Sequence, residues 1–287
     1  MTTSRTLSNE TNQEQFVRAN GIDVHYYEAG SGPDLLLIHG GMVSANPIWT
    51  GIPVAYATYM DEFAEHFHVI APDTRGAGRT VNPSGRPVSF EELADDVAAL
   101  IDALSLDRPA ICGFSEGGIT ATMVGIRHPN RVGAIVNDAG IDHFNPKSLS
   151  FSNLRQILGG SPTATKADPS AMEQMFRSSA EMSAVFDVMV ADHDGGQGTG
   201  HWKKYIEYAF DRSTQPSEFT VEDLGKISAP MLILIGDRDE HFNLPEDAVR
   251  AYRALPCGEL SILPNVGHLI SPAKVQLAID FLKRHGT

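Results

Sequence analysis

The pentapeptide Gly-Phe-Ser-Glu-Gly at positions 113–117 constrains the fold of this chain more than any other feature. It has the form G-x-S-x-G, follows the short apolar run 109–112, and precedes a stretch of small residues at 118–123. The pattern predicts a strand, a sharp turn and a helix, with Ser115 at the apex in a strained backbone conformation. Glycines on either side allow the strand and the helix to pass closely without a clash at Cβ.

Apolar runs and helical patterns alternate on both sides of this turn. A hairpin is expected at 16–28, with its tight turn at Asn20-Gly21. Ser89 and Glu92 form a capping box that opens a helix to about Leu104. Further buried strands are expected at 35–38, 68–71, 109–112, 132–137, 231–235 and 260–263. This alternation predicts an α/β fold with a doubly wound, mostly parallel sheet.

The alternation is interrupted between 141 and 226, where helical and Gly/Ser/Pro-rich sequence contains no buried strand pattern. We therefore expect one α/β core, formed by 15–140 and 227–287, with a helical cap at 141–226 inserted after the strand at 132–137. The polar residues 1–14 are expected to be disordered.

Composition limits the partners of the chain. Its 287 residues carry a formal net charge of −14, which disfavours nucleic acid and anionic membrane surfaces. The uncharged segment 42–60 is interrupted by Pro47 and Pro53, and the polar start lacks a signal-peptide pattern. Cys112 and Cys257 are expected to be buried free thiols in a reducing compartment. These features predict a cytoplasmic monomer or small homo-oligomer.

A serine hydroxyl is a weak nucleophile that needs a base, and the base needs an orienting acid. On a parallel sheet these groups come from loops at the carboxyl ends of strands. Two such loops contain suitable residues, and they place Asp239 and His268 after Ser115 in the chain. Asp237 and Asp138 remain alternatives for the acid. His241 and His39 are interpreted as surface, pocket-wall or structural residues rather than bases.

With these motifs the chain resembles the α/β-hydrolase superfamily over nearly its whole length. The resemblance includes His-Gly-Gly at 39–41, the segment 73–80 with its glycines at 76 and 78, the serine turn, G-x-x-D at 236–239 and Gly-His at 267–268. It implies the order Ser115, Asp239, His268 for the triad. It also implies an oxyanion hole formed by the backbone N–H groups of Glu116 and of Gly41, or Met42 if the register differs by one. The Glu116 side chain should then point away from the oxyanion.

The substrate site is expected to have apolar walls. Met42 and Trp49 are candidates from the segment after the oxyanion loop, and Trp202 is a candidate from the cap. Other cap residues that could face them are Phe151, Met175, Phe186 and Met189. Methionine-rich walls suit bulky or variable apolar ligands. The run Asp-His-Asp at 192–194 with His201 resembles metal ligands in type, but its neighbouring glycines favour a solvated loop. We expect no metal and no cofactor.

The expected activity is that of a serine hydrolase cleaving a carboxylic ester or lactone through an acyl-enzyme. A serine at 115 disfavours epoxide hydrolases and haloalkane dehalogenases, which use a carboxylate nucleophile. The chain is also similar to serine esterases that open macrolide rings, through the segment 39–60, the triad and the medium-sized helical cap. Alternatives that share the triad are a C–C bond hydrolase and a cofactor-free haloperoxidase. A non-catalytic ligand receptor is a third alternative.

Overall fold

The structure is a computed structural model that describes residues 13–46, 56–239 and 242–286. Within these ranges eight strands form one sheet in the order β1-β2-β4-β3-β5-β6-β7-β8. The strands are β1 (Gln13–Ala19), β2 (Ile22–Gly30), β3 (Asp34–Ile38), β4 (His68–Pro72), β5 (Ala110–Phe114), β6 (Ile135–Asp138), β7 (Met231–Gly236) and β8 (Gly258–Leu263).

The sheet is antiparallel at one edge and parallel over the rest of its width. β1 and β2 form the expected hairpin, with Ala19 opposite Ile22, and β2 pairs antiparallel with β4. Every other neighbouring pair from β4 to β8 is parallel. The predicted doubly wound, mostly parallel α/β fold is confirmed.

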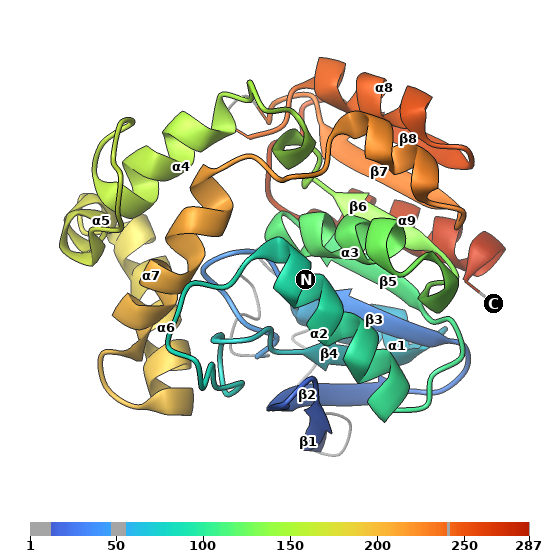
Figure 1. The fold of residues 1–287 in the computed structure, drawn as a ribbon, viewed down its shortest axis with the longest axis horizontal. Helices are drawn as coiled ribbons and strands as arrows, with labels where there is room; N and C mark the ends of the chain where they lie inside the picture. Colours follow the sequence, from blue (N-terminus) through green and yellow to red (C-terminus); the bar gives the residue numbers. More distant parts are fainter. Residues whose placement is uncertain (1–12, 47–55, 240–241, 287) are drawn as a thin grey trace, which may run out of the picture.

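Helices cover both faces of this sheet (Figure 1). The helices of the core are α1 (Met60–Ala64), α2 (Phe90–Ala103), α3 (Glu116–Arg127), α8 (Pro245–Ala254) and α9 (Pro272–His285). One face packs against α2, α3 and α8, and the other face packs against α1 and α9. Along β3, Leu36 and Ile38 point into the first layer, whereas Leu35 and Leu37 point into the second. This double burial explains why the central strands are continuously apolar.

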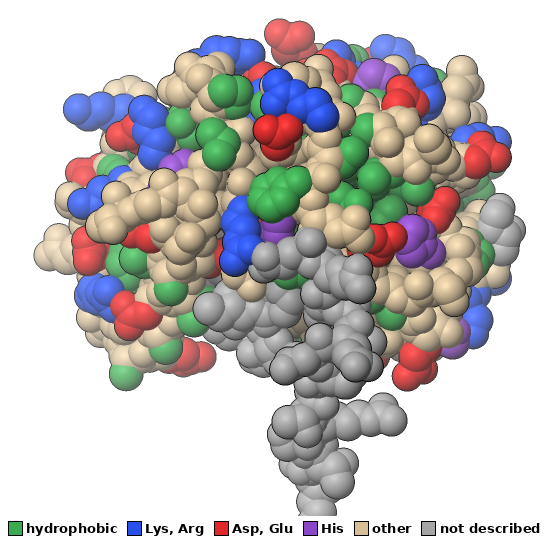
Figure 2. Space-filling model, turned by 90° about the horizontal axis from the view of Figure 1, so that it is seen from below, with side chains coloured by type: hydrophobic (Ala, Val, Ile, Leu, Met, Phe, Trp, Pro, Cys, Tyr) green, Lys and Arg blue, Asp and Glu red, His purple; other side chains and the backbone are tan. Residues whose placement is uncertain are grey.

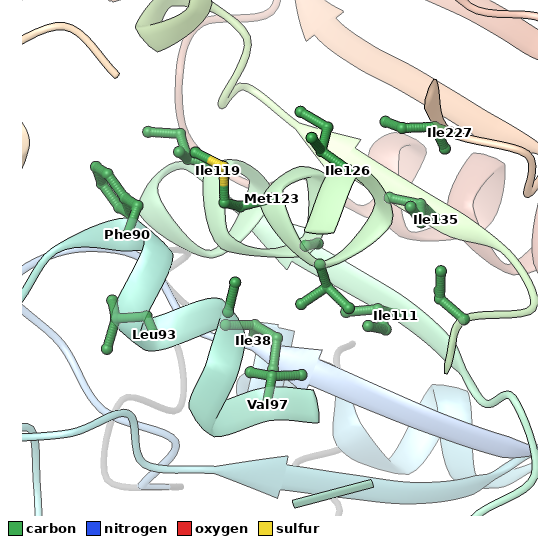
Figure 3. Packing of buried hydrophobic residues seen from close by; sticks show 14 of the residues in the cluster. Ile38, Phe90, Leu93, Val97, Ile111, Ile119, Met123, Ile126, Ile135 and Ile227 are labelled. Atoms are coloured by element: carbon green, nitrogen blue, oxygen red, sulfur yellow. The ribbon is translucent and has the colours of Figure 1, made fainter. Parts of the chain in front are cut away.

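Figure 3 shows the first layer from close by: Ile38, Ile111 and Ile135 from the strands meet side chains of α2 and α3. Ser89 caps α2 by accepting a hydrogen bond from the Glu92 backbone N–H, at 3.2 Å. Two details differ from the sequence-based expectation. Strand β1 begins at Gln13, inside the segment 1–14 expected to be disordered, and residues 1–12 lie outside the described residues. Cys257 is exposed, although Cys112 is buried.

The segment between β6 and β7 is helical, and it lies beyond one end of the sheet in Figure 1. Its α-helices are α4 (Ser150–Gly159), α5 (Pro169–Phe176), α6 (Ala180–Gln197) and α7 (His201–Thr214), and we call them the cap. They share an apolar cluster that includes Met172, Phe186, Trp202 and Tyr205. On the outer surface, acidic and basic side chains are interspersed over the face in Figure 2. No helix of the described residues is long and apolar enough to cross a membrane.

Candidate active site

Ser115 lies in a turn whose backbone is strained. Its φ of 52° and ψ of −118° fall in a region of backbone conformation that residues other than glycine rarely adopt. A Cβ on Gly113 would lie 2.1 Å from the carbonyl oxygen of Gly117, and a Cβ on Gly117 would lie 2.2 Å from that of Ile38. Both glycines are therefore required for the close passage of β5, β3 and α3, as the motif predicts.

The structure brings Ser115, His268 and Asp239 together from the loops that follow β5, β8 and β7. His268 Nε2 lies 3.2 Å from Ser115 Oγ, and His268 Nδ1 lies 2.8 Å from Asp239 Oδ2. The Asp239 side chain is 1% exposed and the His268 side chain 19% exposed. The imidazole packs against the rings of Phe114 and Phe242, with centroids 5.0 and 4.5 Å away. This geometry lets His268 take a proton from the serine hydroxyl while the carboxylate holds its tautomer.

The alternative acids have other partners. Asp237 Oδ1 accepts the backbone N–H of Asn265 at 2.6 Å and so shapes the loop that carries His268. The Asp138 carboxylate forms an ion pair with Lys274 at 2.8 Å. The carboxylate that is hydrogen-bonded to the His268 imidazole is that of Asp239. His241 lies outside the described residues.

Sequence reasoning missed Asn243, which is fully buried behind the acid. Its side-chain amide donates to Asp239 Oδ2 at 3.1 Å and to the carbonyl of Ala139 at 2.7 Å. Its Oδ1 accepts the backbone N–H groups of Ile141 and Asp142. Asn243 therefore ties the acid to the loop after β6. Nothing local in the sequence marks this role, since the contacts with Ala139, Ile141 and Asp142 join residues about a hundred positions apart.

The expected oxyanion hole is surrounded by a polar network. The Glu116 carboxylate lies against Gly41, where an added Cβ would approach its carboxyl carbon to 2.7 Å. Arg212 of α7 donates to Glu116 Oε2 at 2.9 and 3.1 Å, and Ser213 donates to Oε1. This pairing directs the carboxylate to the cap. Met42 has a positive φ of 67°, a backbone conformation that residues other than glycine rarely adopt.

His39 has a structural role in the loop that carries Gly41. Its Nδ1 donates to the carbonyl of Gly40 at 2.7 Å, and its Nε2 accepts the backbone N–H of Thr74 at 3.0 Å. Burial lowers the pKa of His39, so the ring is neutral at pH 7. Hydrogen bonds also hold the segment 73–80 in place, because the Asp73 carboxylate accepts from the backbone N–H groups of Ala45 and Arg79.

A cavity of about 610 Å³ opens over Ser115, between the core and the cap. The residues that line it are mainly apolar and include Met42, Phe114, Ile119, Leu154, Ile157, Leu158, Met175, Phe176, Val185 and Met189. Its ionisable side chains are Glu116, Asp142, Glu181, His143 and His268, so among described residues no lysine or arginine lines it.

The expected substrate contacts are placed differently. Met42 and, from the cap, Met175 and Met189 line the cavity, whereas Trp49 lies outside the described residues. The expectation for Trp202 is not met: its ring packs edge-on against Phe186 at 5.0 Å, in the interior of the cap. Trp202 lies on the face of the amphipathic helix α7 that packs against α6. The helical spacing of apolar residues in the sequence does not show whether such a residue faces the interior of the cap or the cavity.

Burial shifts the pKa values of two ionisable groups of the cavity wall toward their neutral forms. Burial, opposed by a hydrogen bond from Ser150, raises the pKa of Asp142 to about 7. Burial and the charge of Arg212 lower the pKa of His143 to about 3. The wall next to His268 is therefore less charged at neutral pH than its residue types imply.

Of the four residues that resemble metal ligands, Asp192, His193 and His201 join the cap to the core, and Asp194 makes contacts within the cap. Asp192 accepts from Asn46 at 2.8 Å, and His193 Nδ1 accepts from the backbone of Gly78 at 3.1 Å. Asp194 accepts the backbone N–H groups of 200 and 202 at the start of α7. His201 Nε2 donates to the carbonyl of Gly76 at 2.9 Å. Each side chain thus has a structural partner.

Comparison with known proteins places this geometry among hydrolases. A 2-hydroxy-6-oxo-2,4-heptadienoate hydrolase of Pseudomonas putida is 34% identical over 122 residues, 42% of each chain. The alignments with the first two curated relatives thus span only about two-fifths of those proteins. Haloalkane dehalogenase 2 of Mycobacterium tuberculosis is 25% identical over 275 residues, 92% of this chain and 91% of that one.

Solved structures share the fold at lower identity. A meta-cleavage product hydrolase from Pseudomonas fluorescens superposes with a TM-score of 0.71, at 20% identity, over 94% of this chain and 97% of that chain. A thermophilic esterase from Thermogutta terrifontis superposes with a TM-score of 0.70, at 21% identity, over 96% and 100% of the two chains. The sequence profile of the Alpha/beta hydrolase family matches residues 35–275. The chain is a member of the Alpha/beta hydrolase family.

Proposed function

We propose that this hydrolase cleaves a neutral carboxylic ester or lactone through a covalent acyl-enzyme. The observation that carries the proposal is the chain of contacts from Ser115 through His268 to Asp239, at 3.2 and 2.8 Å, facing an apolar cavity. This arrangement supports nucleophilic attack on an acyl carbon, since each member has the partner that its role needs.

In the proposed reaction Ser115 Oγ attacks the substrate carbonyl and passes its proton to His268 Nε2. The backbone N–H groups of Gly41 and Glu116 stabilise the developing oxyanion. His268 then protonates the leaving alcohol oxygen, which is the ring oxygen in a lactone. Water, deprotonated by the same imidazole, cleaves the acyl-enzyme and restores the serine hydroxyl. Asp239 holds Nδ1–H throughout and stabilises the imidazolium.

The cavity supports a bulky substrate without negative charge. Its volume of about 610 Å³ and its apolar walls suit a ligand much larger than a short-chain ester. Its carboxyl groups, without a lysine or arginine among described lining residues, disfavour a carboxylate substrate. A macrocyclic lactone such as a macrolide is the finer form of this proposal, in which ring opening would inactivate an antibiotic.

Hydrolysis of a C–C bond is the second candidate, because the relatives named above include a dienoate hydrolase and a meta-cleavage product hydrolase. A dienoate carries a carboxylate, and this cavity offers no described cationic side chain to bind it. The charge of the lining therefore favours the ester or lactone reaction.

A substrate panel tests the proposal. Neutral acyl esters of increasing size, lactones, macrolides and a 2-hydroxy-6-oxo-dienoate are incubated with the wild type and with Ser115→Ala, and products are identified by mass. We expect addition of one water to esters or lactones, and a loss of activity on the order of 10⁴-fold or more in the variant. Turnover of the dienoate alone would establish the second candidate, and ligand binding without turnover would indicate a receptor.

A further inference from the structure

A charged pair is buried completely beneath the candidate active site. Lys274, near the start of α9, and Asp138, at the end of β6, approach to 2.8 Å, and both side chains are 0% exposed. Lysine and aspartate are rarely buried to this degree, because removing two charges from water is costly unless further polar contacts compensate. The further contacts of this pair involve the backbone of two proposed catalytic residues.

Lys274 Nζ donates a second hydrogen bond, to the backbone carbonyl of His268, at 2.9 Å. On the other side of the pair, the backbone carbonyl of Asp138 accepts the N–H of Ser115 at 2.7 Å. One continuous path therefore joins the backbone of the nucleophile to the backbone of the base. It runs from Ser115 to Asp138, across the ion pair to Lys274, and from there to His268.

The same lysine also lies beneath the aromatic side chain that supports the imidazole. Nζ is 5.9 Å from the centroid of the Phe114 ring, and that ring is 5.0 Å from the ring of His268. The segment that carries His268, between β8 and α9, contains neither helix nor strand. Its position thus depends on individual contacts, and Lys274 supplies one of them from the first turns of α9.

We propose that Lys274 and Asp138 are positioning residues that hold His268 at hydrogen-bonding distance from Ser115. The inference rests on the proposed function, since it assigns the pair to the same catalytic machinery. Neither side chain touches the substrate in this scheme. Loss of the pair should therefore slow the chemical step and leave substrate binding nearly unchanged, because small displacements of a base lower the rate steeply.

The test replaces the pair by apolar side chains, Lys274→Met together with Asp138→Leu. Replacing a buried ion pair in this way is often neutral or stabilising, so the double variant separates positioning from folding. Three quantities are measured: the melting temperature, kcat and KM for a chromogenic ester, and the rate of labelling by a fluorophosphonate probe. Lys283→Met, an exposed lysine on the same helix, is the matched control.

We expect an unchanged melting temperature in the double variant, with kcat and the labelling rate reduced about 10- to 100-fold and KM within about threefold. The control should behave as wild type. If the apolar double variant does not fold, Lys274→Gln with Asp138→Asn is assayed in the same way. Both positions then stay polar, but the glutamine side chain is shorter than lysine and does not reach the His268 carbonyl.

A folded double variant with wild-type kcat and labelling rate would overturn the inference, because the pair would then have no effect on the chemical step. Failure of the proposed function gives a different result. If Ser115 is not the nucleophile, the wild-type protein itself will not be labelled by the probe at this residue.

Discussion

Arg212 of the cap forms an ion pair with Glu116, the residue directly after the nucleophile candidate Ser115, at 2.9 Å. The Arg212 side chain is 1% exposed and that of Glu116 is 15% exposed. Because the Glu116 carboxylate also lies against Gly41, this pair connects the cap to both backbone segments of the proposed oxyanion hole. A negative charge next to a developing oxyanion would raise the barrier, and the arginine counteracts it.

Removing the arginine should therefore affect both stability and rate. For Arg212→Met we expect a loss of about 3 to 5 kcal/mol in the free energy of unfolding, because the Glu116 carboxylate stays buried without its cation. We also expect kcat to fall roughly 10- to 100-fold. Denaturant unfolding and steady-state kinetics measure the two effects. Adding Glu116→Gln should restore much of both, whereas Lys204→Met, at an exposed position of α7, should change neither.

Asp239 and Asp237, two of the three candidate acids, should differ clearly in the effect of their substitution on kcat. Asp239→Asn should lower kcat roughly 10⁴-fold, because an amide stabilises the wrong tautomer of His268. Asp237→Asn should cost less than about tenfold, since an amide oxygen can still accept the N–H of Asn265. Both are read from kcat with one ester substrate, and the reverse ranking would show that Asp237 is the acid.

Asp142 should make stability depend on pH. Its pKa is raised in the folded state from 3.8 to about 7, mainly by burial. The folded protein then binds more protons than the unfolded chain between pH ~4 and ~7, so this carboxyl lowers stability as pH rises through that window. Asp142→Asn should match the wild type near pH 4 and exceed it by on the order of 4 kcal/mol at most above pH ~7.

Denaturant unfolding across this pH range measures the difference for Asp142→Asn. The exposed Asp107→Asn is the control, and its difference from the wild type should stay small and independent of pH. A constant difference for Asp142→Asn as well would mean that this carboxyl does not titrate near neutrality.

Filling the cavity should change the preference for substrate size. Ile157 of α4 lines the cavity, and Ile157→Trp should lower kcat/KM for bulky esters or lactones by roughly tenfold or more, with a small effect on acetyl esters. Leu149→Trp, at the 64% exposed residue before the same helix, should leave the ratio unchanged. Equal losses for large and small substrates in Ile157→Trp would contradict this use of the cavity.

Sequence patterns predicted those features that depend on local chemistry or on the order of elements. The strand–turn–helix at Ser115 follows from the glycines at 113 and 117, and the loops after β7 and β8 supply Asp239 and His268 at the same edge of the sheet. The parallel core could be predicted because its strands, buried on both faces, are continuously apolar.

The rest depends on contacts between distant residues. Asn243, Arg212 and Lys274 are ordinary surface residue types in the sequence, and only the packed fold places them behind the acid, beside Glu116 and beneath His268. Trp202 shows the opposite error, because an aromatic residue of an amphipathic cap helix can face either its neighbouring helix or the cavity. Helical spacing alone does not choose between the two.

The contacts of the cap with the core are distributed unequally among its helices, and this bears on what holds the cavity wall in place. The end of α6 and the start of α7 are fastened to the loop 76–80: Gln197 donates to backbone carbonyls of that loop, and His201 does the same. In contrast, α4 and α5 pack largely on the other cap helices. α4 and α5 are therefore held over Ser115 through α6 and α7. The few hydrogen bonds between Gln197, His201 and the loop 76–80 thus also help to fix the distance between the cavity wall that α4 and α5 supply and the core.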